Sequence, residues 1–307
     1  MQDTKFNLDI FNHPEYDYKI FWTISDFCNF NCPYCYMDKS PPAQFITKSY
    51  SPEFIAECFN NTGINWLIML AGGEPFLMPK FLELSRELTK NHHLQISTNL
   101  TPDTVFKFPD YVSPKRVMVI SASLHVPQRK KVDPEFEKFI EKCLFLQQKG
   151  YRVVVNYVTW PPLLGRMEDD FAYLKKSGIQ NMTAFTFLGT YNGKQYPESY
   201  TEDQIQLISK LAMYRREEDI LRCNTKYKGI PCEAGHKYFT TDIDGNVYKC
   251  RSDMVKHGNL FDGSFKPASK DRKCRADYCI DTYMAEYILN PKEKKPFNWS
   301  SIIPKKK

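Results

Sequence analysis

Apolar and polar positions along the first two thirds of the chain alternate between two periods. Runs rich in β-branched and aromatic residues predict strands, and runs with apolar residues every three or four positions predict helices between them. The predicted strands are 18–25, 66–71, 93–99, 116–124, 152–160 and 182–188, and the predicted helices are 50–60, 79–89, 101–108, 133–148, 167–176 and 201–216. This alternation builds a parallel sheet with helices outside. Six units predict an α/β fold, a partial (β/α)6 barrel of the TIM type, with its chemistry at the carboxyl ends of the strands.

The alternation ends after the last of these helices. Beyond it, Asp244-Gly245 stands between two alternating runs and predicts a β-hairpin. We therefore expect three parts: a barrel over residues 1–217, a small hairpin-containing domain over 218–290, and a basic tail over 291–307.

Composition and charge narrow the class of protein. A chain that is 42% hydrophobic and 25% charged is neither disordered nor low in complexity. No apolar run approaches the roughly 18 residues of a membrane helix, and the first residues lack a signal-peptide pattern. A cytoplasmic protein with no membrane or nucleic-acid partner is the expectation. The net charge of +6 comes largely from the tail, which we expect to be solvated.

Ten cysteines is a high number for a chain without a secretion signal, because disulfides are rare there and metal or redox roles are common. Cys28, Cys32 and Cys35 follow the first predicted strand in a C-x3-C-x2-C spacing. Thiolates bind zinc or an iron–sulfur cluster. A structural zinc site needs four ligands, and no fourth Cys or His lies in this loop. The trio favours a cluster with one open iron, and a zinc knuckle is the alternative.

This spacing, with the aromatic Tyr34 directly before the last cysteine, resembles the signature of the radical S-adenosylmethionine (SAM) superfamily. The resemblance covers roughly residues 15–217. It implies that Cys28, Cys32 and Cys35 hold a [4Fe–4S] cluster whose open iron binds SAM. In that family one electron cleaves SAM, and the resulting 5′-deoxyadenosyl radical abstracts a hydrogen atom from the substrate. A reductant such as flavodoxin or ferredoxin is then an expected partner.

Further positions match the family at the ends of later strands. Gly72-Gly73-Glu74-Pro75 resembles the GGEP motif, which contacts the amino group of SAM in the family, and its glycines let the backbone approach a ligand closely. By the same resemblance, cofactor contacts are expected at Thr98, Asn99, Ser121, Ser123 and Asn156. Taken alone, the serines and Asn156 are equally well explained as ordinary hydrogen-bonded residues at strand ends.

A second group of cysteines lies near the other end of the chain. Cys232 and Cys250 flank the predicted hairpin, and Cys274 and Cys279 follow. Four thiolates in this order predict a closed site. Zinc ribbons use paired C-x2-C knuckles, which are absent here, so zinc is the less favoured ligand.

The pattern Cys-x12-Gly-x4-Cys, from Cys232 through Gly245 to Cys250, is similar to the start of a SPASM domain. Only two cysteines follow, so the segment resembles the shortened twitch domain, which implies one auxiliary [4Fe–4S] cluster. The spacing between Cys274 and Cys279 is longer than usual in that domain, and Cys223 is an alternative ligand.

The resemblance leaves the reaction open between two classes of chemistry. One is oxidation of a small polyol or sugar-like substrate, with the auxiliary cluster accepting the second electron. The other is maturation or epimerisation of a ribosomally made peptide, with Cys223 as the hydrogen-atom donor. A leader-recognition module, common in peptide maturases, is not expected in the short segment before the first strand.

A non-catalytic iron–sulfur or zinc protein is the alternative of another class. The complete GGEP motif and the six-unit barrel argue against it. Cys58 and Cys143 lie among apolar neighbours in predicted helices and are expected to be buried hydrophobic residues. His125 and the loop 189–200 are expected at the mouth of the barrel.

Overall fold

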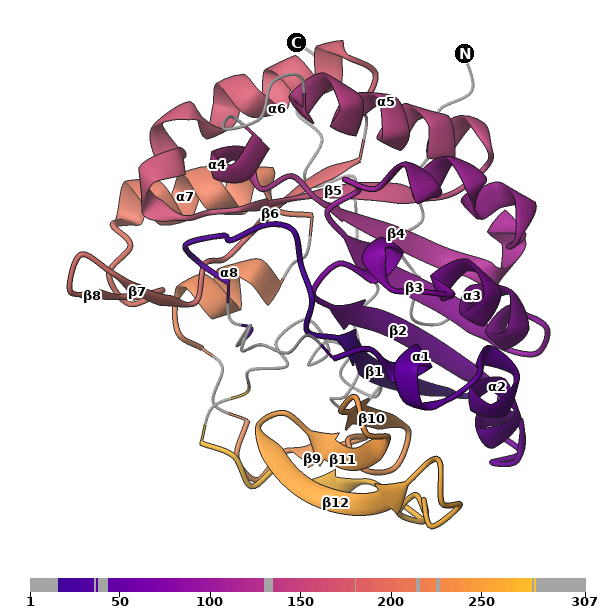
Figure 1. Ribbon diagram of the computed structural model, residues 1–307. Helices are drawn as coiled ribbons and strands as arrows, with labels where there is room; N and C mark the ends of the chain where they lie inside the picture. Colours follow the sequence, from indigo (N-terminus) through magenta and orange to yellow (C-terminus); the bar gives the residue numbers. More distant parts are fainter. Residues whose placement is uncertain are drawn as a thin grey trace, which may run out of the picture.

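A nine-stranded sheet runs through the structure in the order β12-β11-β10-β1-β2-β3-β4-β5-β6 (Figure 1). The structure is a computed structural model, and it describes residues 16–35, 37, 44–129, 135–179, 181–213, 216–224, 227–277 and 279. Six strands run parallel: β1 (Tyr18–Ser25), β2 (Trp66–Gly72), β3 (His93–Thr98), β4 (Val117–Ser123), β5 (Val153–Val158) and β6 (Met182–Phe185). The predicted set of six parallel strands is therefore confirmed, as is the partial TIM-type barrel that they form.

The helices that connect or follow these strands cover one face of the sheet. They are α1 (Ile46–Ser49), α2 (Pro52–Asn60), α3 (Phe81–Thr89), α4 (Val126–Arg129), α5 (Glu135–Gln148), α6 (Met167–Lys176), α7 (Glu202–Leu211) and α8 (Arg216–Leu221). Four short 3-10 helices accompany them: η1 (Pro75–Leu77), η2 (Asp103–Asp110), η3 (Pro114–Arg116) and η4 (Pro161–Arg166). Local sequence sets where α2 begins, because the Ser51 hydroxyl accepts a hydrogen bond from the Phe54 N–H and Pro52 occupies the first turn.

Alternate residues of each parallel strand point to opposite faces of the sheet. One set, exemplified by Ile20, Trp22 and Ile68, is fully buried against the helices. The other set faces the concave side of the barrel, where Leu67 and Met69 belong to a separate apolar cluster. The helix-facing side is thus the core of the fold, and the concave side is free to carry chemistry.

Two of the predicted helices differ from the observed ones. The region 101–108 forms the 3-10 helix η2 rather than an α-helix, and Pro109 lies inside η2. The single helix predicted over 201–216 is wrong, because α7 ends at Leu211 and α8 is a separate helix. Ala212 adopts an extended conformation, and the Met213 N–H donates to the Thr183 hydroxyl at 3.0 Å, which holds the chain against β6.

The C-terminal segment extends the same sheet. β10 (Tyr238–Thr241) pairs in parallel with β1, and β11 (Asn246–Cys250) and β12 (Asp253–Asn259) follow in antiparallel order. The predicted hairpin at Asp244-Gly245 is confirmed, and Gly245 has a φ of +78°, which suits glycine. These strands, orange to yellow in Figure 1, lie beside β1. The division into domains at residues 217 and 290 stays a prediction, and the tail lies outside the described residues.

Four shorter strands form two separate ribbons. β7 (Gly189–Tyr191) and β8 (Lys194–Tyr196) make a small hairpin beyond β6, which projects from the body in Figure 1. β9 (Pro231–Cys232) pairs with β13 (Arg272–Lys273). Throughout the described ranges, no helix is long and apolar enough to cross a membrane.

Candidate active site

The loop that carries the first three cysteines begins directly after β1. Cys28 is half-buried, Cys32 is buried and Cys35 is exposed, and the Cys35 N–H donates to the Cys32 carbonyl at 3.1 Å. The side-chain amide of Gln128 in α4 fixes the middle of the loop, because its Nε2 donates to the Asn31 carbonyl at 2.7 Å and its Oε1 accepts from the Asn31 N–H. The loop is therefore held at the carboxyl edge of the sheet, where the barrel fold predicts chemistry.

Two glycines at the end of β2 pack directly on the start of this loop. A Cβ atom on Gly72 would lie 2.1 Å from the Ser25 carbonyl oxygen, and one on Gly73 would lie 1.9 Å from the Phe27 carbonyl oxygen. The Gly73 and Glu74 N–H groups donate to these same two carbonyls at 2.8 and 2.7 Å. Glycine is therefore needed at both positions for a structural reason that the sequence did not reveal. The absence of side chains lets the backbone at the end of β2 pack against the backbone at the start of the cysteine loop.

Glu74 joins the end of β2 to the end of β3. Its carboxylate accepts hydrogen bonds from the Thr98 hydroxyl at 2.6 Å, the Asn99 N–H at 2.6 Å and the Phe76 N–H at 3.0 Å. The side chain is fully buried, and burial raises the pKa of the carboxyl to about 7 although all three hydrogen bonds lower it. These contacts fix the geometry of the chain where β2 and β3 end. Contact with SAM stays a prediction for Gly72, Gly73, Glu74 and Pro75.

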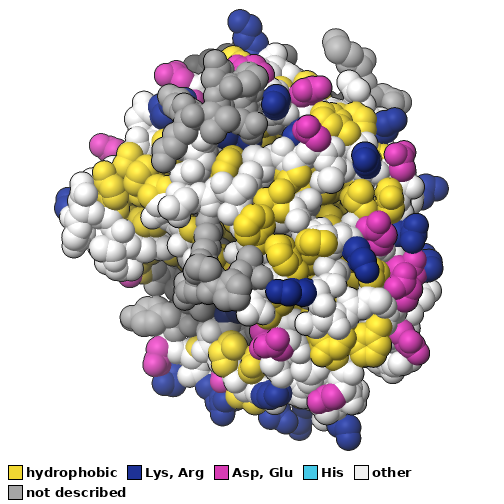
Figure 2. Space-filling model, viewed as in Figure 1, with side chains coloured by type: hydrophobic (Ala, Val, Ile, Leu, Met, Phe, Trp, Pro, Cys, Tyr) yellow, Lys and Arg dark blue, Asp and Glu magenta, His cyan; other side chains and the backbone are white. Residues whose placement is uncertain are grey.

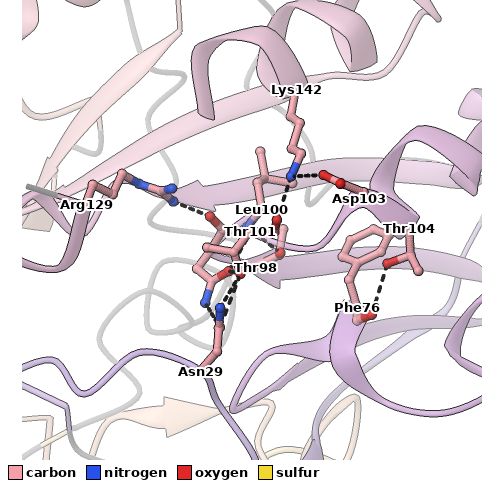
Figure 3. A network of polar contacts seen from close by, with 10 residues as sticks. Asn29, Phe76, Thr98, Leu100, Thr101, Asp103, Thr104, Arg129 and Lys142 are labelled. Carbon is pink, nitrogen blue, oxygen red and sulfur yellow. Dashed lines mark hydrogen bonds and ion pairs between the residues drawn. The ribbon is translucent and has the colours of Figure 1, made fainter. Parts of the chain in front are cut away.

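Asn99 lies between this carboxylate and the cysteine loop. Its Nδ2 donates to Cys28 Sγ at 3.7 Å and to Asn29 Oδ1 at 3.1 Å. Figure 3 shows the surrounding network, in which Asn29, Thr98, Thr101 and Arg129 converge on this point. On the other side of the network, the buried Lys142 ammonium binds the Thr101 carbonyl at 2.5 Å and Asp103 at 2.9 Å.

Arg129 in α4 is a site residue that sequence reasoning missed. Its guanidinium is buried and donates to the carbonyls of Asn99, Leu124 and Ser123, so it connects the ends of β3 and β4. It also lies 5.3 Å from the centre of the Phe30 ring of the cysteine loop, a cation–π distance. Arg129 begins a run of basic residues, which carries no sequence signal of burial.

Aromatic side chains line the approach to the cysteine loop. The Tyr34 hydroxyl lies 3.2 Å from His125 Nδ1, and the two rings stack with centroids 5.8 Å apart. Trp160 contacts the Tyr34 ring, and Tyr191 of the β7–β8 hairpin contacts Trp160. Burial, and then the nearby Cys32 thiol, raise the pKa of the Tyr34 hydroxyl. The expectation that His125 and the 189–200 loop lie at the barrel mouth agrees with this chain of contacts.

The remaining predicted cofactor residues lie on the concave face in matching register. Ser97 pairs with Ser121, and Ser123 pairs with Asn156, so their side chains lie on the same face in two successive rows, one across β3 and β4 and the next across β4 and β5. Ser121 is buried, and Ser123 and Asn156 are half-buried. Their contacts with SAM, like those of Thr98 and Asn99, stay predictions.

The structure brings together three of the four cysteines predicted to form the second site. Cys232 and Cys250 are buried in the apolar cluster of the concave face, and Cys274 packs against them. Burial, with a smaller effect from the Cys274 and Cys250 thiols, raises the pKa of the Cys232 thiol to about 12. Cys279 is half-buried, and its neighbours 278 and 280 lie outside the described residues. Its role, and the auxiliary cluster, stay predictions.

Asp253 connects the segments that carry two of these cysteines. Its carboxylate binds the ammonium of Lys249 at 2.9 Å and the guanidinium of Arg275 at 2.7 Å. These cations are the sequence neighbours of Cys250 and Cys274. The hydrogen bond from Arg275 is the largest factor that lowers the pKa of Asp253, to about 2.

Cys223, the proposed hydrogen-atom donor, follows α8 with a φ of +57°. Its N–H donates to the Ile220 carbonyl, so it occupies the left-handed position that often ends a helix. The neighbouring Arg222 is bound to Glu202 and Glu218. The donor role stays a prediction. Cys58 and Cys143 are buried in α2 and α5, as expected.

Among the described residues, no group of three or more His, Cys, Asp or Glu side chains is arranged to hold a single metal ion. A [4Fe–4S] cluster asks for a different arrangement, because each thiolate binds a different iron. The donor chemistry of the first loop fits such a cluster: three thiols lie within eight residues, and those of Cys32 and Cys35 both act electrostatically on the Tyr34 hydroxyl.

The fold and this site together define a barrel that presents three thiols and a packed Gly-Gly-Glu turn at the carboxyl edge of its sheet. A match to a known family identifies the class of protein to which this barrel belongs. Residues 22–174, about half of the chain, match the family described as the Radical SAM superfamily. The chain belongs to the radical SAM superfamily, which is a superfamily of enzymes. The predicted [4Fe–4S] cluster and SAM are the cofactors of this superfamily.

Solved structures with the same fold include enzymes with bound peptides. The chain is similar to anSMEcpe with bound AdoMet and the Kp18Cys peptide, at 17% identity and a TM-score of 0.58, over 81% of this chain and 80% of that one. It is also similar to Streptococcus suis SuiB bound to the precursor peptide SuiA, at 12% identity and a TM-score of 0.56, over 82% of this chain and 65% of that one. At these identities the likeness concerns the fold.

Curated relatives match a shorter stretch. A probable GTP 3′,8-cyclase of Saccharolobus islandicus is 31% identical over 90 residues, which are 29% of this chain and 28% of that protein. The chain therefore spans less than a third of the length of the curated relatives that it matches.

Proposed function

We propose that this chain cleaves SAM reductively and uses the resulting radical to abstract a hydrogen atom from a substrate on the concave face of the barrel. The observation that carries the proposal is the packing of the cysteine loop on the Gly72–Glu74 turn and on Asn99, which holds three thiols at the carboxyl edge of the sheet. A bound cluster would supply one electron to the carbon–sulfur bond of SAM.

The chain's own residues would bind and orient this chemistry. Cys28, Cys32 and Cys35 would ligate the cluster. The half-buried backbone at Gly73, together with the polar side chains of Ser121, Ser123 and Asn156, would receive the amino acid and ribose parts of SAM. The aromatic group formed by Tyr34, His125, Trp160 and Tyr191 would shield the reaction from water at the barrel mouth.

The half-buried positions of the concave face suit a polar substrate. The half-buried inward positions Thr23, Gln95, Ser97, Ser123 and Asn156 carry hydroxyls and amides. Such groups form hydrogen bonds with hydroxyls or peptide groups without the desolvation cost of a charge. Oxidation of a small polyol or sugar-like molecule is our first candidate, with the auxiliary site at Cys232, Cys250, Cys274 and Cys279 as the acceptor of the second electron.

Modification of a peptide is the second candidate, with Cys223 as the hydrogen-atom donor for epimerisation. It is favoured by the likeness of the fold to anSMEcpe and SuiB, both of which were solved with peptides bound. Peptide groups would satisfy the same hydroxyls and amides of the concave face.

A reductant such as flavodoxin or ferredoxin would complete the reaction. Lys and Arg side chains gather along the lower edge of the molecule in Figure 2, where the C-terminal strands lie in Figure 1. Lys256, Lys266 and Arg272 are exposed in these strands and the loop between them. A positive edge of this kind would attract an acidic redox partner.

The decisive experiment is reconstitution with iron and sulfide under anaerobic conditions, followed by addition of SAM and dithionite. We expect release of 5′-deoxyadenosine from the wild type and none from Cys32→Ala, with Cys143→Ala as the matched control because Cys143 lies in the helix layer. Release from the Cys32→Ala variant at the wild-type rate would refute the proposal. In deuterium oxide, loss of solvent label from the product of Cys223→Ala would support the epimerase candidate, and unchanged labelling would exclude Cys223 as the donor.

A further inference from the structure

Every polar group of Asn99 has a partner. Its backbone N–H donates to Glu74 at 2.6 Å, and its carbonyl accepts from the Arg129 guanidinium. Its side-chain Oδ1 accepts from the Thr101 N–H at 2.9 Å and from the Thr101 hydroxyl at 2.6 Å. A residue held at each of these points has little freedom to turn, and it is only 3% exposed.

These contacts fix which way the side-chain amide points. The Thr101 N–H is a backbone donor and can only face an acceptor, so the amide oxygen must lie on the Thr101 side. The Nδ2 group is therefore directed toward Cys28 Sγ at 3.7 Å and Asn29 Oδ1 at 3.1 Å. The Phe30 N–H also donates to Cys28 Sγ, at 3.4 Å.

We propose that Asn99 tunes the reduction potential of the cluster through its hydrogen bond to Cys28 Sγ. This inference rests on the proposed function in that it takes Cys28 as a cluster ligand. Hydrogen bonds to the sulfurs are one of the factors that set the potential of an iron–sulfur cluster. Reduction adds negative charge to the cluster and its thiolates, so a donor aimed at the sulfur stabilises the reduced form more than the oxidised form. Asn99 is thus a positioning residue that acts through Cys28.

The contact between the Asn99 amide and Cys28 Sγ is rigid because Asn99 is held in place by its neighbours. Glu74 and Arg129 hold the backbone of Asn99 from opposite sides, and Thr101 holds its side chain. The same residues tie β2, β3 and α4 together, so the direction of the amide is set by the fold rather than by the loop. Pre-organisation of this kind keeps a donor in place without reorganisation when charge develops.

The test is an anaerobic redox titration of the reconstituted full chain. Reduction is monitored by the electron paramagnetic resonance signal that changes when SAM is added. We expect Asn99→Ala to lower the equilibrium constant for reduction about tenfold, which is a fall of about 59 mV for a one-electron couple. Asn99→Asp keeps the volume and the acceptor for Thr101 but loses both amide donors, and we expect at least the same fall. Resonance Raman bands of the iron–thiolate bonds should shift in both variants.

Asn29→Asp is the matched control, because it places the same negative charge next to Cys28. The amide of Asn29 donates to the Thr101 hydroxyl and accepts from the Asn99 amide, so this variant tests the effect of charge. A smaller fall in Asn29→Asp than in Asn99→Asp supports the inference. Wild-type potentials and Raman bands in both Asn99 variants would overturn it, as would equal shifts in the two Asp variants with none in Asn99→Ala. A wild type that binds no iron would overturn the proposed function as well, whereas an iron-loaded wild type with unshifted variants refutes this inference alone.

Discussion

Glu74 offers a prediction whose sign and size follow from its burial. Its carboxyl has an ordinary pKa of 4.5 when unfolded and about 7 in the folded chain, and desolvation is the largest cause. Between these values the folded state binds more protons than the unfolded state, so the free energy of unfolding falls as the pH rises from about 4.5 to 7. At 1.36 kcal/mol per pKa unit, the fall amounts to about 3 kcal/mol.

Replacing Glu74 by Gln removes this dependence and adds a constant cost. One carboxylate oxygen of Glu74 accepts from the Asn99 N–H, and the other accepts from the Thr98 hydroxyl and the Phe76 N–H. The glutamine NH2 group must replace one of these two oxygens, so it faces at least one donor. One buried donor left without an acceptor costs about 1–3 kcal/mol. We therefore expect Glu74→Gln to be less stable than the wild type at pH 5 by about 2 kcal/mol, and this deficit to vanish or reverse by pH 8.

The assay is urea unfolding of the full chain with its cysteines reduced, repeated from pH 5 to 8 for both proteins. Thr104→Val is a suitable control, because it removes a hydroxyl that donates to the Phe76 carbonyl in the same region without changing an ionisable group. Infrared difference spectra should show a protonated carboxyl band near neutral pH that Glu74→Gln lacks. A stability difference between wild type and Glu74→Gln that stays constant over this range would refute the reasoning.

Three further predictions follow from buried groups and close contacts. His92→Leu should remove a rise in stability of about 3 kcal/mol between pH 4 and 6.5, because burial lowers the pKa of His92 to about 4; a pH-independent difference would contradict this. Gly73→Ala should abolish iron incorporation, since its Cβ would overlap the Phe27 carbonyl, while Gly165→Ala, which meets nothing within 4 Å, should leave it unchanged. Asp253→Asn should lower the free energy of unfolding by about 2 kcal/mol, because the ammonium of Lys249 loses its partner; an effect no larger than that of exposed Asp244→Asn would argue against it.

The sequence predicted the strands well because each alternates strictly or is bounded by glycine and polar residues. β1 and α6 have the predicted limits, and β2 differs by one residue at Gly72. The helix predicted over 201–216 failed for a tertiary reason. Its local pattern is helical throughout, but the bond from the Met213 N–H to the Thr183 hydroxyl draws the chain back to β6. Single-sequence patterns carry no information about such a partner thirty residues away.

The site shows the same division between local and tertiary information. The cysteine spacing and the Gly-Gly-Glu-Pro motif could be read directly, because each is contiguous. Arg129 and Gln128, which hold the cysteine loop, could not be found, since they belong to no motif and their partners lie far away in the sequence. The parallel pairing of β10 with β1 was likewise invisible, because the two strands are more than two hundred residues apart.

That pairing places the two groups of cysteines on one continuous sheet. β10 adjoins β1, so the strand that leads into Cys28 is bonded to the hairpin that ends in Cys250. Cys232 and Cys250 belong to the apolar cluster that includes Leu67 and Met69 of β2 on the concave face. A substrate on this face would therefore lie between the first cysteine loop at the carboxyl edge and the second trio toward the opposite edge. An oxidation that took a hydrogen atom near the first loop and an electron near the second trio would use this order, which supports oxidation as the first candidate in our proposal.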